Sequence, residues 1–393
     1  MQLNDGGKPA DAALRQGCDQ QPAGDRLNIY AFYLPQFHPI PENDEWWGKG
    51  FTEWTNTAKA KPLFRGHYQP HVPADLGFYD LRTPESRVAQ ADLARAYGID
   101  GFCYYHYWFA GRRIIERPFQ EVLESGKPDF PFMLCWANQT WTGIWHGAPN
   151  RVLIEQTYTG EDDHRRHFDY LLSAFEDRRY VRIDGKPIFI IYQSQSFPDR
   201  ARTFDLWRNL ASKEGLPGLH LVGVVMGEQD WTPEERGFDA CVINNLPARR
   251  PHIPIRRPLR WLRNEYQVRT HLPTIYNYSE VMDDFLRELS PPEKYYQTLI
   301  PNWDNTPRSG AKGLVLHNWT PDLWRQHAKR GLELASRARD PHRLLFIKSW
   351  NEWAEGNHLE PDLRYGLAPL KIFRDARAER EAQLAAITSE SRA

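Results

Sequence analysis

The chain has 393 residues, of which 41% are hydrophobic and 26% are charged, and its formal net charge is −1. This near-neutral balance argues against the broad basic surface by which proteins bind nucleic acids or anionic membranes, so no nucleic-acid partner is expected. The apolar runs are short, as at residues 188–192, whereas a membrane-spanning helix needs about 20 apolar residues, so no integral membrane segment is expected.

Residues 1–27 are polar, and they lack the basic-then-apolar pattern of a signal peptide. We predict that they form a disordered leader and that the protein is cytoplasmic. The cysteines agree with this location, and the lack of a C-x-x-C pair argues against a zinc ribbon or a thioredoxin-like site. Cys103, Cys135 and Cys241 lie in predicted strands and are expected to be buried, inert thiols.

Eight short segments are predicted to form parallel strands that are covered on both faces, because most are continuous apolar runs rather than alternating ones. In chain order they are residues 28–34, 101–107, 132–137, 187–193, 220–226, 240–245, 298–303 and 344–350.

Helical patterns lie between several of these strands. Residues 83–97 have Pro84 just inside the start and Gly98 just past the end, which is the expected asymmetry of a helix. Further helices are expected at residues 162–177, 278–289 and 321–337.

Strands that alternate with helices in this number predict an α/β fold, a (β/α)8 TIM barrel, as a single domain with long βα loops. We assign residues 28–366 to the barrel and residues 367–393 to a C-terminal helix and tail. Residues 247–276 are rich in Pro and Arg and are predicted to be a functional loop or small insertion, and residues 314–319 an extra strand outside the barrel.

The most informative stretch follows the last predicted strand and reads W-N-E-W-A-E-G at residues 350–356. In a helical turn, the Cβ atoms of Glu352 and Glu355 would lie roughly 5–6 Å apart. Retaining glycosidases hold two carboxyls about 5–5.5 Å apart, and tryptophan faces stack on sugar rings. The alternative is a pair of surface glutamates beside two core tryptophans.

The barrel favours the catalytic interpretation, because active sites of such barrels lie at the C-terminal ends of the strands. Polar and aromatic side chains collect at those ends and in one neighbouring loop. We therefore predict that substrate is bound by His38, Trp54, Tyr105, His106, Tyr107, Trp136, Asn138, Tyr192, Asn244, Trp303, Asp304, Trp350 and Trp353.

Several of these residues have a structural alternative. The tyrosines could belong to the barrel core, Asn138 could be a turn residue, and Asp304 could form an Asx-turn with Thr306. His67 and His71 have i, i+4 spacing, but Pro70 and Pro73 break any helix there. We predict no metal and no cofactor.

Several segments resemble WbsX-type proteins, which share the fold of glycoside hydrolase family 99, a family of endo-α-mannosidases and endo-α-mannanases. The similarity spans about residues 28–366, and it is carried by residues 31–38, 50–54, 73–80, 101–108, 131–138, 302–308, 350–356 and 359–362.

The resemblance implies a retaining α-glycosidase site. By position, Glu352 would be the general base that takes the proton of the sugar 2-hydroxyl, so that a 1,2-anhydro intermediate forms. Glu355 would be the general acid to the leaving oxygen and then the base to water. The residues alone indicate only two close carboxylates in one retaining site, and they do not separate this route from a glycosyl-enzyme intermediate.

We therefore predict a retaining α-glycoside hydrolase that acts on a bacterial cell-surface polysaccharide or its oligosaccharide precursor. One alternative is a glycosyltransferase of O-antigen, capsule or lipopolysaccharide biosynthesis, although the chain has neither G-x-G-x-x-G nor Asp-x-Asp. A second is a non-catalytic carbohydrate-binding barrel. The partner in each case is a carbohydrate, and the oligomeric state stays open.

One segment departs from the family pattern. Residues 136–147 read W-A-N-Q-T-W-T-G-I-W-H-G, where WbsX-type proteins usually carry W-A-N-E-N-W-T-R-R-W-D-G. The loss of two arginines and two acids from one loop is expected to change which sugar binds, especially an anionic one.

Overall fold

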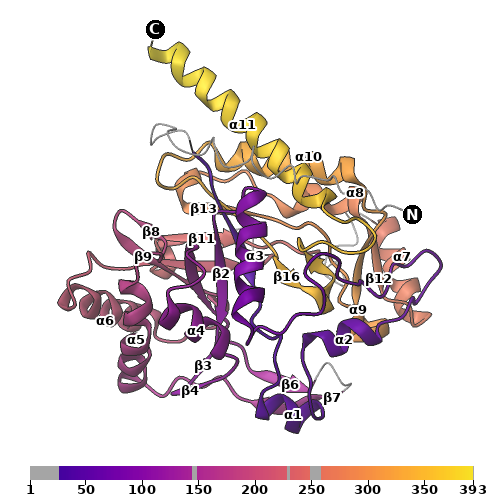
Figure 1. Cartoon of the computed structure of the whole chain (residues 1–393), viewed down its shortest axis with the longest axis horizontal. Coiled ribbons are helices and arrows are strands. Elements are labelled where there is room, and N and C mark those ends of the chain that lie inside the picture. Colours follow the sequence, from indigo (N-terminus) through magenta and orange to yellow (C-terminus); the bar gives the residue numbers. More distant parts are fainter. Residues whose placement is uncertain (1–25, 144–147, 228–230, 248–257, 393) are drawn as a thin grey trace, which may run out of the picture.

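The computed structural model describes residues 26–143, 148–227, 231–247 and 258–392. Its centre is a closed barrel of parallel strands in the order β10-β11-β13-β15-β1-β2-β5-β9, and the pairing of β9 with β10 closes the ring (Figure 1). The strands are β1 (Asn28–Tyr33), β2 (Gly101–His106), β5 (Phe132–Trp136), β9 (Lys186–Ile191), β10 (His220–Val225), β11 (Ala240–Ile243), β13 (Tyr295–Leu299) and β15 (Leu344–Ile347). The predicted (β/α)8 barrel is confirmed.

The barrel strands are buried along almost their whole length, as their continuous apolar sequences predict. Cys103, Cys135 and Cys241 are free and buried within them. Residues 1–25 of the predicted leader lie outside the described residues. Leu27, which directly precedes β1, packs in the core.

Two sequence-based assignments were wrong. The seventh strand covers Tyr295–Leu299 rather than 298–303, because it pairs with β11 at Tyr295 and with β15 at Gln297. The helix predicted at residues 278–289 is shorter, with α8 (Tyr278–Val281) followed by the 3-10 turn η4 (Met282–Phe285). It stops because the Gln297 side chain holds both the backbone N–H and the carbonyl of Arg287 beside β13.

Helices cover the outside of the barrel (Figure 1). The covering helices are α3 (Pro84–Ala96), α4 (Arg117–Ser125), α5 (Glu161–Glu176), α6 (Arg200–Lys213), α10 (Pro321–Ala335) and α11 (Ala368–Arg392). Thr320 caps α10 by accepting a hydrogen bond from the Leu323 N–H. The yellow helix α11 runs along α10 and extends beyond the barrel (Figure 1).

The loops carry the remaining elements. They comprise the helices α1 (Pro41–Trp47), α2 (Glu53–Lys59), α7 (Pro258–Arg269) and α9 (Thr306–Ser309), the 3-10 turns η3 (Glu234–Arg236), η5 (Pro292–Lys294), η6 (Gly310–Lys312) and η7 (Trp353–Glu355), and the strands β3 (Trp108–Phe109), β4 (Arg112–Arg113), β6 (Trp141–Gly143), β7 (Ala148–Ile154), β8 (Arg182–Ile183), β12 (Thr274–Asn277), β14 (Leu314–His317), β16 (Asn351–Glu352) and β17 (Asn357–His358). No helix in the described part of the chain is long and apolar enough to cross a bilayer.

The insertion and the extra strand belong together. β14, within the predicted extra strand at 314–319, pairs in parallel with β12 of the 247–276 segment, outside the barrel. Above this pair lies a second apolar cluster that contains Tyr276, Tyr278, Val281, Phe285, Ile300, Trp303, Leu314 and Leu316. Residues 248–257 of the predicted functional loop lie outside the described residues.

Candidate active site

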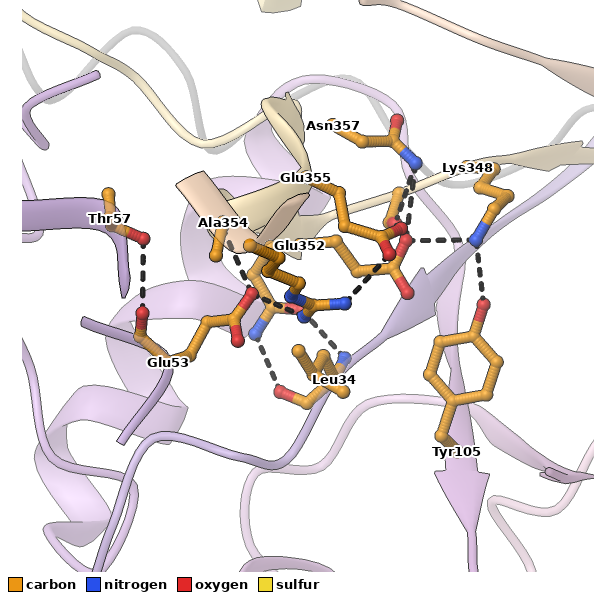
Figure 2. A network of polar contacts seen from close by, with 12 residues as sticks. Leu34, Glu53, Thr57, Tyr105, Lys348, Glu352, Ala354, Glu355 and Asn357 are labelled. Atoms are coloured by element: carbon orange, nitrogen blue, oxygen red, sulfur yellow. Dashed lines mark hydrogen bonds and ion pairs between the residues drawn. The ribbon is translucent and has the colours of Figure 1, made fainter. Parts of the chain in front are cut away.

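The two glutamates lie on a short hairpin that turns back over the barrel after β15. Glu352 ends β16, Glu355 lies in η7, and Gly356 has a left-handed φ of +55°. A Cβ on Gly356 would lie 2.8 Å from the Asp304 Cβ, so only glycine fits there. Asn351 fastens the hairpin to the end of β1, because its amide accepts from the Leu34 N–H at 2.7 Å and donates to the Leu34 carbonyl at 3.0 Å (Figure 2).

Glu352 is buried, with 5% of its surface exposed, and one carboxylate oxygen accepts hydrogen bonds from several side chains. Its Oε2 lies 2.9 Å from Lys348 Nζ, 2.7 Å from Ser349 Oγ and 3.2 Å from Asn357 Nδ2 (Figure 2). Burial opposes ionisation, but the Lys348 ammonium and the Ser349 hydroxyl outweigh it and lower the pKa of Glu352. Glu352 is therefore held as a carboxylate.

Glu355 has the opposite electrostatic environment. Its Oε1 accepts from Arg308 Nη1 at 2.7 Å, and its side chain is 18% exposed. Burial raises the pKa of Glu355 to about 7, the Arg308 guanidinium opposes the shift and the Glu352 carboxylate adds to it. Near neutral pH a large share of Glu355 is thus protonated, while Glu352 is ionised. A pair whose pKa values are pushed apart suits one acid and one base.

The Arg308 guanidinium links three βα loops next to Glu355. Its Nη2 lies 2.5 Å from Glu53 Oε1, and the same oxygen accepts from the Ala354 N–H at 3.0 Å. Glu53 is 1% exposed, and burial raises its pKa although Arg308 opposes the shift. The link holds α2, α9 and the hairpin that carries Glu352 and Glu355 (the candidate catalytic hairpin) in fixed relation.

Lys348 lies between Glu352 and three aromatic rings, those of Tyr105, Tyr192 and Trp303, which we call the aromatic floor. Its Nζ lies 3.1 Å from Tyr105 Oη, and it stands 5.7, 5.9 and 5.5 Å from the ring centroids of Tyr105, Tyr192 and Trp303. Burial disfavours its charge, yet Glu352 raises the pKa of Lys348. The lysine is cationic and lies between the carboxylate and the rings.

Tyr105, Tyr192 and Trp303 thus lie around the Lys348 ammonium, which contacts Glu352, and a role for them in substrate binding stays a prediction. Tyr107 is a buried neighbour of this group, and its ring meets Trp141 edge-on at 5.3 Å. Asp304 adjoins the pair through its backbone, whose N–H donates to the Glu355 carbonyl at 2.6 Å. Its side chain accepts from His67, Gln69 and Thr306, so its carboxylate serves the architecture of the loop, including the alternative turn with Thr306.

The indole groups of Trp54 and Trp353 are buried near the hairpin and bonded within the protein. The Trp54 indole donates to the Tyr79 carbonyl at 2.8 Å, and the Trp353 indole to Glu360 Oε2 at 2.6 Å. Trp350 is completely buried and packs against Phe102. These three tryptophans pack inside the protein next to the hairpin and support its conformation.

Other predicted residues lie in different surroundings. His106 bonds His167 at 2.8 Å within an aromatic cluster that also contains Trp136. His38 is buried on the far side of the α1 loop, and burial lowers its pKa to about 4. Asn138 bonds Tyr158 and the Gln193 N–H and lines a 530 Å³ cavity, and Asn244 is buried at the end of β11.

A second cavity opens beside the hairpin, on the other side of Trp303. Its volume is about 330 Å³, and aromatic rings and polar groups both line it. The lining includes Trp303, Trp319, Tyr365, Asn302, Arg364 and Gly356. Gly356 follows Glu355 directly, so this cavity reaches the residue next to Glu355 in the chain.

Glu53, Arg308 and Lys348 were missed as site residues by sequence reasoning. Glu53 and Arg308 lie in stretches that carried the resemblance, so that signal was available. Lys348 also carried a sequence signal, because it is a single cationic residue directly after the apolar run 344–347. What sequence did not offer was their convergence, because Glu53 and Arg308 are 255 residues apart.

A parallel eight-stranded barrel with a carboxyl pair and aromatic rings at its strand ends places the chain among carbohydrate-active barrel proteins. The chain belongs to the family described as Glycosyltransferase WbsX, whose sequence model matches residues 29–373.

Two curated relatives are both called uncharacterized protein WxcX. They come from Xanthomonas campestris pv. campestris, strains B100 and ATCC 33913, and each is 39% identical over 354 residues. The match covers 88% of this chain and 49% of each relative, so the chain spans about half the length of the curated relatives it matches.

Solved structures share the fold. A glycoside hydrolase-like protein superposes with a TM-score of 0.54 at 15% identity, covering 89% of this chain and 93% of that one. The GH99 endo-alpha-mannosidase from Bacteroides thetaiotaomicron has a TM-score of 0.53 at 15% identity, covering 91% and 98%. At these identities the likeness shows the barrel fold.

Proposed function

We propose that the protein is a retaining α-glycoside hydrolase that uses Glu352 as base and Glu355 as acid and then base. The observation that carries the proposal is the contrast between the two carboxyls. Glu352 accepts from three donors and is ionised, whereas burial raises the pKa of Glu355 to about 7. An acid–base pair of this kind is what glycoside cleavage needs.

The first step follows from these protonation states. Glu352 takes the proton of the sugar 2-hydroxyl as that oxygen attacks C1. The bond from C1 to the leaving oxygen breaks, and Glu355 gives its proton to that oxygen. This 1,2-anhydro route is the one that the resemblance of the W-N-E-W-A-E-G segment implies. A direct attack of Glu352 on C1 would use the same two protonation states.

The second step reverses the roles. Glu355, now a carboxylate, takes a proton from water as the water oxygen attacks C1. The C1–O2 bond of the anhydro sugar opens, and O2 regains the proton held by Glu352. Two inversions at C1 give net retention of the α configuration. Atoms and protons balance, and both glutamates return to their starting states.

We further propose that the substrate is a bacterial cell-surface polysaccharide or its oligosaccharide precursor. The 330 Å³ cavity beside Glu355, with Trp303, Trp319 and Tyr365 in its lining, supports a substrate of more than one sugar unit. The free buried thiols support action in the reducing cytoplasm.

A glycosyltransferase is the second candidate, and the name of the family, Glycosyltransferase WbsX, favours it. In chemical terms, a sugar hydroxyl would replace water in the second step. A thermal-shift screen separates the two donor classes, because a ligand at about 100 times its Kd stabilises by about 2.7 kcal/mol and raises Tm by a few degrees. A response to oligosaccharides supports hydrolysis of a glycan, and a response to nucleotide sugars alone would overturn it.

A further inference from the structure

Behind the candidate catalytic hairpin, two histidines and an aspartate from separate segments converge. One ligand atom from each of His71, His358 and Asp362 lies within 4.8 Å of the other two, and all three residues are buried. His71 follows the α2 loop, His358 ends β17, and Asp362 lies four residues beyond it. The i, i+4 spacing of His67 and His71 suggested a different pair, but His67 turns to Asp304 at 2.6 Å.

Hydrogen bonds orient His358 as a metal ligand is oriented. Its Nδ1 lies 2.9 Å from the Glu360 carbonyl, to which it donates a proton. That bond leaves Nε2 with a lone pair, and Nε2 faces His71 Nδ1 at 2.9 Å. A ring N–H held by a backbone carbonyl is the usual outer contact of a metal-bound histidine, because it fixes the tautomer and the ring plane.

Asp362 is oriented in the same way. Its Oδ1 accepts from the Arg364 N–H at 2.9 Å and from the Tyr365 N–H at 2.6 Å. The Tyr68 hydroxyl also bonds this carboxylate. The backbone bonds hold the carboxylate plane in place without filling both oxygens.

A small cavity adjoins two of the three residues. His358 and Asp362 lie in its lining with Asn302, and its volume of about 10 Å³ is close to that of one water molecule. Two imidazole nitrogens, one carboxylate oxygen and a water make a four-coordinate set. Zinc prefers this number and these ligands.

We propose that His71, His358 and Asp362 bind a divalent transition-metal ion, with zinc as the best match. Zn–N bonds of about 2.0–2.1 Å in a tetrahedron place two nitrogens roughly 3.3 Å apart, so the two rings separate by about 0.4 Å when the ion enters. The hydrogen that His71 Nδ1 shares with His358 moves to the other ring nitrogen of His71.

The position of the site makes its role structural. His358 stacks on Trp353 with ring centroids 3.8 Å apart, and Trp353 lies between the two glutamates in sequence. The His358 N–H donates to Asn302 Oδ1 at 3.2 Å, next to Trp303 of the aromatic floor. An ion here would tie the loop at 71–73 to the segment that supports the candidate catalytic hairpin.

The test uses the full chain with its affinity tag removed, stripped with chelator and then titrated with zinc. We expect one equivalent to remain after gel filtration, and Co²⁺ in its place to show the visible absorption bands of a tetrahedral site. H71Q and H358Q should weaken zinc binding by at least about 100-fold. H317Q is the matched control, since His317 lines the neighbouring cavity and is not among the three ligands.

Circular dichroism and gel filtration establish that each variant is folded, and D362N provides a third variant that can keep an acceptor for the backbone amides. Zinc should raise the Tm of the wild type and of H317Q by a few degrees, and leave the other variants unchanged. Less than a tenth of an equivalent of zinc in the reloaded wild type, or equal binding in wild type, H71Q and H358Q, would overturn the proposal. These measurements do not depend on catalytic activity.

Discussion

At the scale of single residues, Lys348 determines what Glu352 does. It is buried beside the carboxylate and is the cation that lowers the pKa of Glu352 against the effect of burial. Sequence reasoning finds the two glutamates from their spacing and the tryptophans around them. It does not reveal that one glutamate is charged and the other largely protonated, because that depends on partners brought in by the fold.

Replacement of Lys348 by Met should raise the pKa of Glu352. In the proposed mechanism Glu352 works ionised, so the acidic limb of the kcat/KM profile should move to higher pH, and activity should fall at least about tenfold more at pH 5 than at pH 7. K348R keeps the charge and is the control. An acidic limb that stays in place in K348M would show that Lys348 does not set the state of Glu352.

Glu355 makes the complementary prediction. It works protonated in the first step and its pKa is about 7, so kcat/KM should decline as the pH rises through about 7. E355Q should lose on the order of 10²–10⁴ in rate, and its residual activity should lack this basic limb. Full activity in E355Q would remove Glu355 from the mechanism.

At the scale of elements, the candidate catalytic hairpin depends on a close approach at Gly356. Gly126 also has a positive φ, +69°, but no heavy atom lies within 4 Å of a Cβ built there. Both G126A and G356A should cost about 1 kcal/mol for the left-handed backbone. G356A should cost a further ~1–3 kcal/mol from overlap with Asp304 and reduce kcat at least about tenfold.

Urea unfolding and steady-state kinetics on these two variants separate backbone strain from displacement of the hairpin. If G356A matched G126A in both measurements, the contact with Asp304 would not be what positions Glu355.

The contact between α10 and β13 adds an acid-sensitive element. His327 of α10 accepts from the Ile300 N–H at 3.1 Å, and burial lowers its pKa to about 3. In the unfolded chain the pKa of His327 is near 6.5. Between this pH and the folded pKa of about 3, the unfolded chain binds one more proton than the folded chain. The free energy of unfolding therefore decreases in this range by about 1.4 kcal/mol for each unit by which the pH is lowered. H327Q should flatten the loss of unfolding free energy between pH 7 and pH 5, and an unchanged slope would contradict this.

At the scale of the whole molecule, the barrel and the positions of the insertion and the extra strand were predictable, whereas the pairing between them was not. Short, continuous apolar runs such as 188–191 predict buried parallel strands, and Pro84 and Gly98 frame α3 within a residue or two. Gln297 and Tyr295 hid the start of β13, because neither looks like a buried strand residue in sequence. β12 pairs with β14, which lies 40 residues further along the chain, and local sequence patterns do not reveal such a pairing.

The last helix, α11, is bonded to the segments that directly precede β1 and β2. Arg377 of α11 donates to the carbonyls of Leu27 and Gly98 and pairs with Asp100 at 2.9 Å. Leu370 and Phe373 are buried against the core, so α11 contributes apolar contacts as well as these bonds.

The measurement that tests the central claim most directly is proton NMR of the product anomer during digestion of a responsive α-linked oligosaccharide, with wild type, E352Q and E355Q run in parallel. We predict that the wild type releases the α anomer first and that both variants are slowed on the order of 10²–10⁴. Release of the β anomer first, or undiminished turnover by E355Q, would contradict a retaining mechanism built on these two glutamates.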